Sequence, residues 1–172
     1  MEHGFVQVYT GNGKGKTTAA IGLAVRAAGA GLKILFCQFL KSQNYSEIKA
    51  LGQFNRAIEI RQFGNESFVT GVPAESDVSI AVNGFEDALT AVMSGIYDLV
   101  VLDEINVAIR LNLIMLQSVV QLMKNKPAGV ELVLTGRDAA KEVIENADLV
   151  TEMKETKHYF SKGVKARQGI EM

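Results

Sequence analysis

The sequence predicts an α/β fold in which a mostly parallel sheet carries helices on both of its faces. Short apolar runs alternate along the chain with segments whose apolar residues recur at helical spacing, a pattern typical of buried parallel strands joined by helices. The first apolar run also passes through a glycine-rich loop directly into an Ala-rich helix. With 172 residues and no visible linker or repeat, the chain is expected to form one domain, 1–172.

The elements follow in order from these patterns. The expected strands are the mainly apolar segments 5–9, 33–39, 97–102, 129–134 and 149–153, together with 57–61, which alternates like a strand. The expected helices are 17–28, a short helix that Asn44 could cap, 75–93, 112–124 and 139–145. On the 75–93 helix, the residues expected on the core face are Val78, Val82, Phe85, Leu89 and Val92. The segment 62–73 is long enough to be a functional loop, and the tail 154–172 is polar.

Ligands on parallel sheets bind at the carboxyl ends of the strands, and the segments that follow the strands are therefore expected to meet at one edge. These segments are the glycine loop 11–17, Phe39-Leu40-Lys41, the loop 62–73, Asp103-Glu104 and Thr135-Gly136-Arg137.

The glycine loop is typical of a phosphate-binding loop. It has glycines at positions 11, 13 and 15, and it ends in Gly15-Lys16-Thr17 at the start of a helix. Glycines let successive N–H groups point into one concavity, and the helix N-terminus adds further donors. Lys16 would pair with the terminal phosphates and the Thr17 hydroxyl with Mg²⁺. The fold class is therefore P-loop NTPase-like, and the alternative is a simple glycine turn between a strand and a helix.

This loop departs from the usual pattern in two ways. Thr10 stands where the first glycine normally lies, and Lys14 is an additional lysine. The phosphates are therefore expected to lie differently from those of an ordinary ATPase.

Asp103 and Glu104 end an apolar run and are candidate ligands for Mg²⁺, which prefers hard oxygen donors. A solvated strand end is the alternative interpretation. Arg137, after a later strand, could bind phosphate or a substrate amide, or form an ordinary surface ion pair.

The composition excludes several classes of function. A formal net charge of −1 argues against nucleic acid or an anionic membrane surface as partner. No apolar run is long enough to span a bilayer and no signal peptide is visible, so a cytoplasmic location is expected. The single cysteine, Cys37, excludes an internal disulfide; its apolar surroundings favour a buried hydrophobe over a nucleophile.

Over nearly its whole length the chain resembles the ATP:corrinoid adenosyltransferases, the P-loop type of cob(I)alamin adenosyltransferase. The unusual loop and the tail together carry the resemblance. The matching segments are 9–20 (YTGNGKGKTTAA), 38–41 (QFLK), 100–104 (VVLDE), 134–137 (LTGR), 147–153 (ADLVTEM), Lys157-His158, 163–166 (GVKA) and Gly169-Ile170.

The resemblance implies that a Co(I) corrinoid attacks the 5′ carbon of ATP and expels triphosphate, in adenosylcobalamin synthesis or salvage. It implies ATP binding by Gly11, Asn12, Gly13, Lys14, Gly15, Lys16, Thr17, Thr18 and Arg26. It also implies Mg²⁺ held by Thr17 with Asp103 or Glu104.

For the corrinoid, the resemblance implies contacts from Phe39, Lys41, Phe68, Arg137, Lys157 and His158. Phe68 best matches an aromatic residue that fills the lower face of the corrinoid, although it could instead anchor its loop on the core. Some members carry a tryptophan close by, where this chain has Val69-Thr70. Some also carry an N-terminal helix over the active site. This chain begins at the first strand, so its tail is expected to do part of that work.

The resemblance further implies a homodimer and a reduced flavoprotein as electron donor. Two other functions stay open. An ordinary P-loop ATPase or small-molecule kinase would release orthophosphate or a phosphorylated product. A carrier of nucleotide or corrinoid would bind without turnover.

Overall fold

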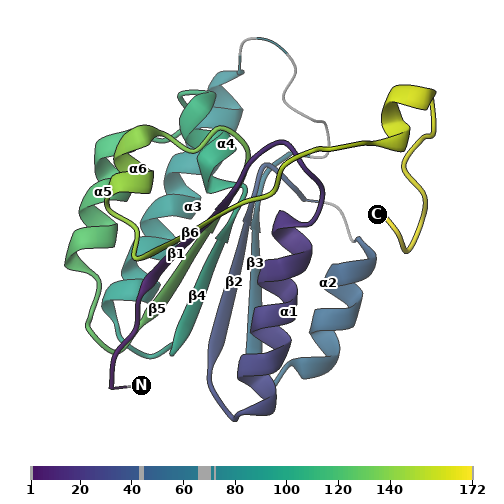
Figure 1. Ribbon diagram of the computed structural model, residues 1–172. Coiled ribbons are helices and arrows are strands. Elements are labelled where there is room, and N and C mark those ends of the chain that lie inside the picture. Colours follow the sequence, from purple (N-terminus) through teal and green to yellow (C-terminus); the bar gives the residue numbers. More distant parts are fainter. Residues whose placement is uncertain (1, 43–44, 66–70, 72, 172) are drawn as a thin grey trace.

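A computed structural model of the protein describes residues 2–42, 45–65, 71 and 73–171 (Figure 1). Within these ranges the strands form one sheet of six, and every neighbouring pair is parallel. The order across the sheet is β3-β2-β4-β5-β1-β6. The strands are β1 (Val6–Thr10), β2 (Ile34–Phe39), β3 (Ile58–Phe63), β4 (Leu99–Asp103), β5 (Glu131–Thr135) and β6 (Leu149–Glu152). The α/β fold is therefore confirmed, and the sheet is parallel throughout.

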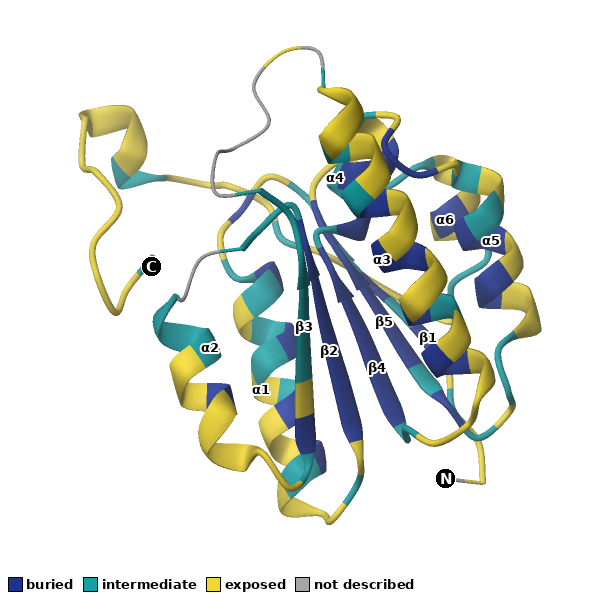
Figure 2. Cartoon of the chain, turned by 180° about the vertical axis from the view of Figure 1, so that it is seen from behind, coloured by how far each residue is buried: buried dark blue, intermediate teal, exposed yellow. Residues whose placement is uncertain are grey.

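Helices cover both faces of the sheet (Figures 1 and 2). One face carries α1 (Lys16–Gly29) and α2 (Ser46–Leu51), which is followed by the 3₁₀ turn η1 (Gly52–Phe54). The other carries α3 (Glu75–Met93), α4 (Ile105–Arg110), α5 (Leu116–Asn125) and α6 (Lys141–Glu145). None of the helices in the described ranges is long and apolar enough to cross a membrane.

The central strands are apolar because both of their faces are covered. Every residue of β2 and β4 is buried (Figure 2). On the α1 side the strands pack against a stripe of alanines, Ala20, Ala24 and Ala27. Such small side chains let a helix backbone approach the sheet closely.

The helix 75–93 was predicted with the observed limits, but two residues of its expected core face are partly exposed. Val78 is 37% and Val82 38% exposed. The buried stripe runs through smaller residues, among them Ala81, Gly84 and Ala88. A Cβ at Gly84 would lie 2.3 Å from the Phe63 ring. Phe85 and Val92 are buried on the same face, so the helix meets the sheet with small side chains interspersed with larger apolar ones.

The expected helix 112–124 is wrong at its start, and a helix was missed before it. α4 spans Ile105–Arg110, and α5 begins only at Leu116. Asn112 has φ 55°, a left-handed conformation that interrupts a right-handed helix. The strand expected at 57–61 also continues to Phe63, which shortens the loop after it.

The carboxyl ends of all the strands lie at one edge of the sheet, as expected from the parallel order (Figure 1). After β6 the chain crosses above this edge and reaches the far side of α1, where it forms the 3₁₀ turn η2 (Tyr159–Lys162). The phosphate loop, the ends of β2, β4 and β5, and the C-terminal segment thereby come together.

Candidate functional site

The phosphate loop owes its shape to three glycines with two different tasks. Gly11 and Gly15 have φ values of 93° and 119°, which side-chain-bearing residues rarely adopt. Gly13 is required by close approach, because a Cβ there would lie 2.6 Å from the carbonyl oxygen of Met153. The Gly13 N–H donates a 2.6 Å hydrogen bond to this same carbonyl. The segment after β6 therefore supports the loop from outside.

Lys16 lies at the first position of α1 and is almost fully buried, with 8% exposure. Its Nζ donates to the carbonyl oxygens of Gly11 and Gly13, each at 2.7 Å. Burial lowers the pKa of Lys16, and the positive charge of Arg137 lowers it further. The ammonium is thus held inside the loop, next to the backbone that would surround a phosphate.

Asp103, at the end of β4, is fully buried and hydrogen-bonded at both oxygens. Thr17 and Thr135 donate their hydroxyls to Oδ1 at 2.8 and 2.7 Å. Gln38 donates to Oδ2 at 3.2 Å, and Lys41 forms an ion pair with the same oxygen at 3.4 Å. These partners come from α1, β2, β5 and the segment after β2, so Asp103 joins four parts of the site.

Glu104 follows directly and has a different environment. Its backbone is left-handed, with φ 63°, and its N–H donates to the Thr135 hydroxyl at 3.0 Å. Within the described ranges its carboxylate accepts no hydrogen bond, whereas that of Asp103 accepts several. Burial and the neighbouring charge of Asp103 raise the pKa of Glu104. The structure therefore contains one fully bonded carboxylate beside one that is free to accept a cation.

Lys41 supplies a second positive charge near these acids. Burial lowers the pKa of Lys41, but the carboxylates of Asp103 and Glu104 outweigh that effect, so its pKa is raised overall. Lys41 therefore stays protonated at neutral pH.

A cleft of about 650 Å³ opens above these residues. Its inner wall is formed by the loop and the start of α1 (residues 13–18), and its sides by Lys41, Glu47, Glu104 and Arg137. The C-terminal segment closes it with His158, Gly169, Ile170 and Glu171. Seven predicted ATP or metal residues and three predicted corrinoid residues thus share one cleft: Gly13, Lys14, Gly15, Lys16, Thr17, Thr18, Glu104, and Lys41, Arg137, His158.

A larger hollow of about 870 Å³ lies elsewhere, between α3 and α5. It is lined mainly by apolar side chains, including Val82, Met93 and Met115. None of the predicted site residues lines it, so size alone does not identify the site.

Several other predicted residues are not brought into the cleft. Gly11 belongs to the loop and accepts from Lys16. Asn12 lines a neighbouring polar hollow with Arg137 and Glu152. Arg26 lies ten residues beyond Lys16, about 15 Å further along α1 at the usual helical rise. Its role in ATP binding stays a prediction.

Phe39 requires a correction, because its side chain is fully buried and packs on Phe63 with ring centroids 5.4 Å apart. It has no surface to offer a corrinoid and acts as core. Lys157 is exposed and does not line the cleft. Phe68 and Val69-Thr70 lie outside the described residues, so the expectation for the lower face of the corrinoid stays a prediction.

Sequence reasoning missed the residues that hold Asp103. Gln38 is fully buried, and its own Oε1 accepts from Gln62 at 2.9 Å. Thr135 connects Asp103 to the backbone of Glu104. The available signals were a glutamine inside an otherwise apolar strand and a threonine at a strand end, since buried polar side chains need partners.

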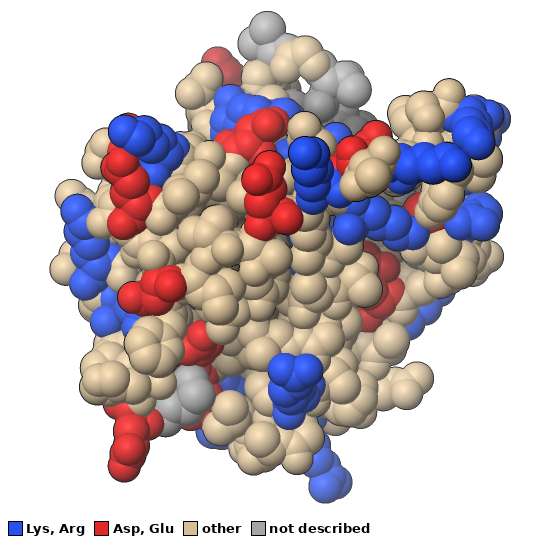
Figure 3. All heavy atoms as spheres, viewed as in Figure 1, with Lys and Arg blue, Asp and Glu red and all other residues tan. Residues whose placement is uncertain are grey.

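Positive charge gathers around the cleft although the whole chain is slightly acidic. Figure 3 shows Lys and Arg side chains clustered where the C-terminal segment passes over the edge of the sheet. Between residues 154 and 171 these are Lys154, Lys157, Lys162, Lys165 and Arg167. An anionic ligand would therefore be attracted to this edge despite the net charge of −1.

Fold and site together define a protein with a P-loop NTPase-like fold, in which the loop, a strand-end acid pair and a cationic cover surround one cleft. Residues 2–172 match the family model of the ATP:corrinoid adenosyltransferases BtuR/CobO/CobP, and the chain belongs to this family.

Curated relatives match nearly the whole chain and extend beyond the matched part. A corrinoid adenosyltransferase from a Sinorhizobium species is 37% identical, with 99% of this chain and 81% of the relative covered. The corrinoid adenosyltransferase of Escherichia coli K12 is 34% identical, with 99% and 86% covered. Corrinoid adenosyltransferase CobA of Salmonella typhimurium is 31% identical over the same shares.

Proposed function

We propose that this chain transfers the 5′-deoxyadenosyl group of ATP to the Co(I) centre of a corrinoid and releases triphosphate. The observation that carries the proposal is the single cleft in which the phosphate loop, Lys16 and Glu104 meet, in a chain that belongs to the adenosyltransferase family. The bond that forms joins cobalt to the 5′ carbon, and the bond that breaks joins this carbon to the triphosphate oxygen. Both electrons of the new bond come from Co(I).

The loop would hold the triphosphate through its backbone N–H groups and through Lys16. The Lys16 ammonium already lies 2.7 Å from two loop carbonyls and would exchange these acceptors for phosphate oxygens. Negative charge grows on the leaving triphosphate, so donors fixed at this place stabilise the transition state more than the ground state. No general acid is needed, because triphosphate leaves without a proton.

The residues present fit Mg²⁺. The described residues contain no group of three or more His, Cys, Asp or Glu that could hold a metal by themselves. Mg²⁺ normally uses only one or two carboxylates and completes its shell with phosphates and water. Thr17 and Glu104 would hold it, with Asp103 keeping the Thr17 hydroxyl in position. When bound, it would neutralise charge on the triphosphate.

On the corrinoid side, Arg137, Lys41 and His158 line the cleft and are the described residues that could meet a second substrate. The contribution of the chain there is positioning, because Co(I) is already a strong nucleophile and needs alignment with the 5′ carbon. The homodimer and the reduced flavoprotein donor are proposed from the family resemblance alone, and the cytoplasmic location stays an expectation from the sequence.

An ordinary ATPase or kinase is the second candidate, and a binding protein without turnover is the third. The departure at Thr10 disfavours the second, because the loop of ordinary ATPases has glycine there. The acid pair beside the loop disfavours the third, because binding alone does not need a metal site next to the phosphates.

Product analysis distinguishes the three. The protein is incubated anaerobically with MgATP and chemically reduced cobalamin, and both the corrinoid spectrum and the phosphorus products are followed. We expect a light-sensitive alkyl-cobalamin and one triphosphate per turnover. Orthophosphate or ADP with an unchanged corrinoid would overturn the proposal in favour of the second candidate, and binding without any product would favour the third.

A further inference from the structure

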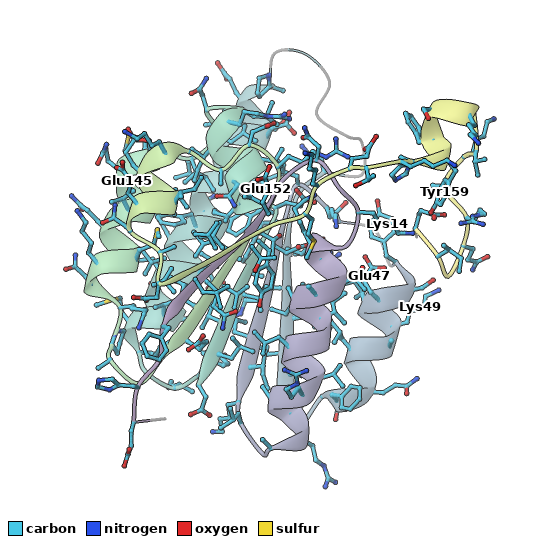
Figure 4. The ribbon with its side chains drawn as sticks, in the orientation of Figure 1. Lys14, Glu47, Lys49, Glu145, Glu152 and Tyr159 are labelled. Atoms are coloured by element: carbon cyan, nitrogen blue, oxygen red, sulfur yellow. The ribbon has the colours of Figure 1, made fainter. Side chains whose placement is uncertain are left out.

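The two lysines of the phosphate loop have separate partners. Lys16 points into the loop, whereas Lys14 points out of it toward the C-terminal segment (Figure 4). The Lys14 Nζ lies 2.8 Å from Glu171 Oε1 and 3.1 Å from both the Tyr159 hydroxyl and the Ile170 carbonyl oxygen. All three acceptors belong to residues 159–171, far from Lys14 in sequence.

The acceptors of Lys14 are themselves joined. Tyr159 donates its hydroxyl to Glu171, and Arg167 forms an ion pair with Glu171 at 3.1 Å. The Arg167 guanidinium also lies 5.0 Å from the centre of the Tyr159 ring, within range of a cation–π contact. Hydrogen bonds from Arg167, Lys14 and Tyr159 hold the pKa of Glu171 below its usual range, so its carboxylate is ionised at neutral pH.

The place of this cluster matters because the cleft is closed there. Gly169, Ile170 and Glu171 line the cleft together with loop residues, including Lys14. Between Glu152 and this wall the chain has only one short 3₁₀ turn and crosses the sheet edge largely exposed. Within the described ranges, the hydrogen bonds that join the phosphate loop to residues 159–171 all come from the Lys14 ammonium.

We propose that Lys14 and Glu171 are positioning residues, which fasten the C-terminal segment 157–171 to the phosphate loop as the outer wall of the nucleotide cleft. Lys14 then acts on the nucleotide through this segment and not by direct contact with the triphosphate. The inference rests on the part of the proposed function that places ATP in the cleft. It goes beyond that function because it assigns Lys14 and the C-terminal segment a shared role in closing the nucleotide cleft.

The expected size of the effect is moderate. A single ion pair at an exposed position contributes little free energy. The effect expected here comes from several contacts that together order one segment. A segment that must be ordered when nucleotide binds lowers the apparent affinity by the fraction of molecules in which it is displaced. We therefore expect a loss of affinity of roughly three- to tenfold when the contact is removed, far below the effect of removing a phosphate ligand.

The test measures MgATP binding directly by calorimetry or equilibrium dialysis on the full chain. The variants are Lys14→Met, Glu171→Gln and the two combined, with Lys14→Arg as the conservative replacement. Lys162→Met, in the same segment but outside the cluster, is the matched control. Tryptic cleavage after Lys157, Lys165 or Arg167, sites that all the variants keep, reports in parallel whether the segment is fastened.

We expect Lys14→Met and Glu171→Gln to weaken MgATP binding alike, by roughly three- to tenfold, and to speed tryptic cleavage of the segment. The combined variant should lose less affinity than the two single losses added together, because both changes break the Lys14–Glu171 contact, while each also removes contacts of its own. Lys14→Arg should recover most of the binding that Lys14→Met loses, and Lys162→Met should bind like the unaltered chain. In turnover the loss should appear in KM for ATP more than in kcat.

A different pattern overturns the inference. If Lys14→Met weakens binding while Glu171→Gln binds equally well or more tightly, then Lys14 contacts the triphosphate directly. Additive losses in the combined variant, or unchanged binding in all variants, would overturn it as well. Because the readout is nucleotide binding, the result does not depend on corrinoid turnover, and failure of the adenosyl transfer itself would be seen separately.

Discussion

The inner and outer halves of the cleft differ in burial and in the number of elements that hold them. The inner half contains Lys16 and Asp103, both buried, with hydrogen bonds from several elements of the sheet. The outer half is the C-terminal segment, whose residues are mostly exposed and which meets the loop through Lys14. Buried charges with fixed partners are suited to transition-state stabilisation, whereas an exposed cover held by a few ion pairs is suited to opening and closing.

The same contrast divides the two neighbouring acids. Asp103 is fully buried and bonded at both oxygens, so its position is fixed before any ligand arrives. Glu104 is held by its backbone through Thr135, while its carboxylate stays available. Asp103 therefore holds the surrounding side chains in position, and the carboxylate of Glu104 remains available to bind a cation.

The contrast between the two halves of the cleft predicts that substitution of Lys16, in the inner half, has the largest effect on activity. Lys16→Ala removes the ammonium that would meet the charge growing on triphosphate, and we expect kcat/KM for adenosyl transfer to fall roughly 10²- to 10³-fold. Initial rates of alkyl-cobalamin formation measure this. Lys124→Ala, an exposed lysine on α5, should stay within twofold of the unaltered chain. Full activity of Lys16→Ala would contradict both the inner-half assignment and the proposed function.

A smaller effect is expected where the outer segment supports the loop. Gly13→Ala would place a Cβ 2.6 Å from the Met153 carbonyl oxygen, a backbone atom that cannot turn aside. We expect a loss of about 1–3 kcal/mol in the free energy of unfolding, measured by urea denaturation.

The matched control for this change is Gly22→Ala on α1, where a Cβ meets nothing within 4 Å. It should stabilise the protein by about 0.5–1 kcal/mol, because alanine favours the helix. Equal effects at the two glycines would show that the contact with Met153 does not constrain the loop.

The smallest effect on stability concerns Glu104 and depends on pH. Burial and Asp103 raise the pKa of Glu104 in the folded protein. The folded state therefore binds its proton more tightly than the unfolded state, and stability is lost as the pH rises from the unfolded pKa through the folded pKa. At pH values above this window, Glu104→Gln should melt at a higher temperature than the unaltered chain. At pH values below it, this difference in melting temperature should disappear.

Melting curves between pH 4 and 8, without nucleotide or Mg²⁺, measure this difference for Glu104→Gln. Glu142→Gln, an exposed position on α6, is the control and should show no such trend. An advantage of Glu104→Gln that grows toward low pH would refute the direction of the pKa shift. In turnover the same variant should lose Mg²⁺-dependent activity, since the available carboxylate is gone.

Much of the fold was predictable because its signals are local. The 75–93 helix was predicted with its observed limits, and all the strands were found to within two residues at either end. The fully buried strands β2 and β4 are continuous apolar runs or nearly so, and β3 was found from its alternation. α4 was missed because six residues that follow a strand directly are too few for a helical period to be recognised. The exposure of Val82 was missed because hydrophobicity does not say which of two apolar stripes meets the sheet.

For the site, the loop and the acid pair were predictable from residue types and spacing, which are typical of phosphate binding and of Mg²⁺ binding. The exclusion of Phe39 was not, since an aromatic residue at a strand end can face either the core or the cleft. Gln38 and Thr135 were seen in the sequence without a role, because their common partner Asp103 lies 65 and 32 residues away.

The sequence by itself determined the class of the fold, the phosphate loop, the strand-end acids and the family. Each of these depends on residues that are neighbours along the chain or repeat at a fixed spacing. Only the tertiary structure decided that Lys16 and Lys14 face opposite ways, and that Lys14 meets Glu171 across 157 positions of sequence. The physical reason is that a side chain's partner depends on which elements the packed sheet brings to the same edge, and the sequence order of the strands does not state their order in the sheet.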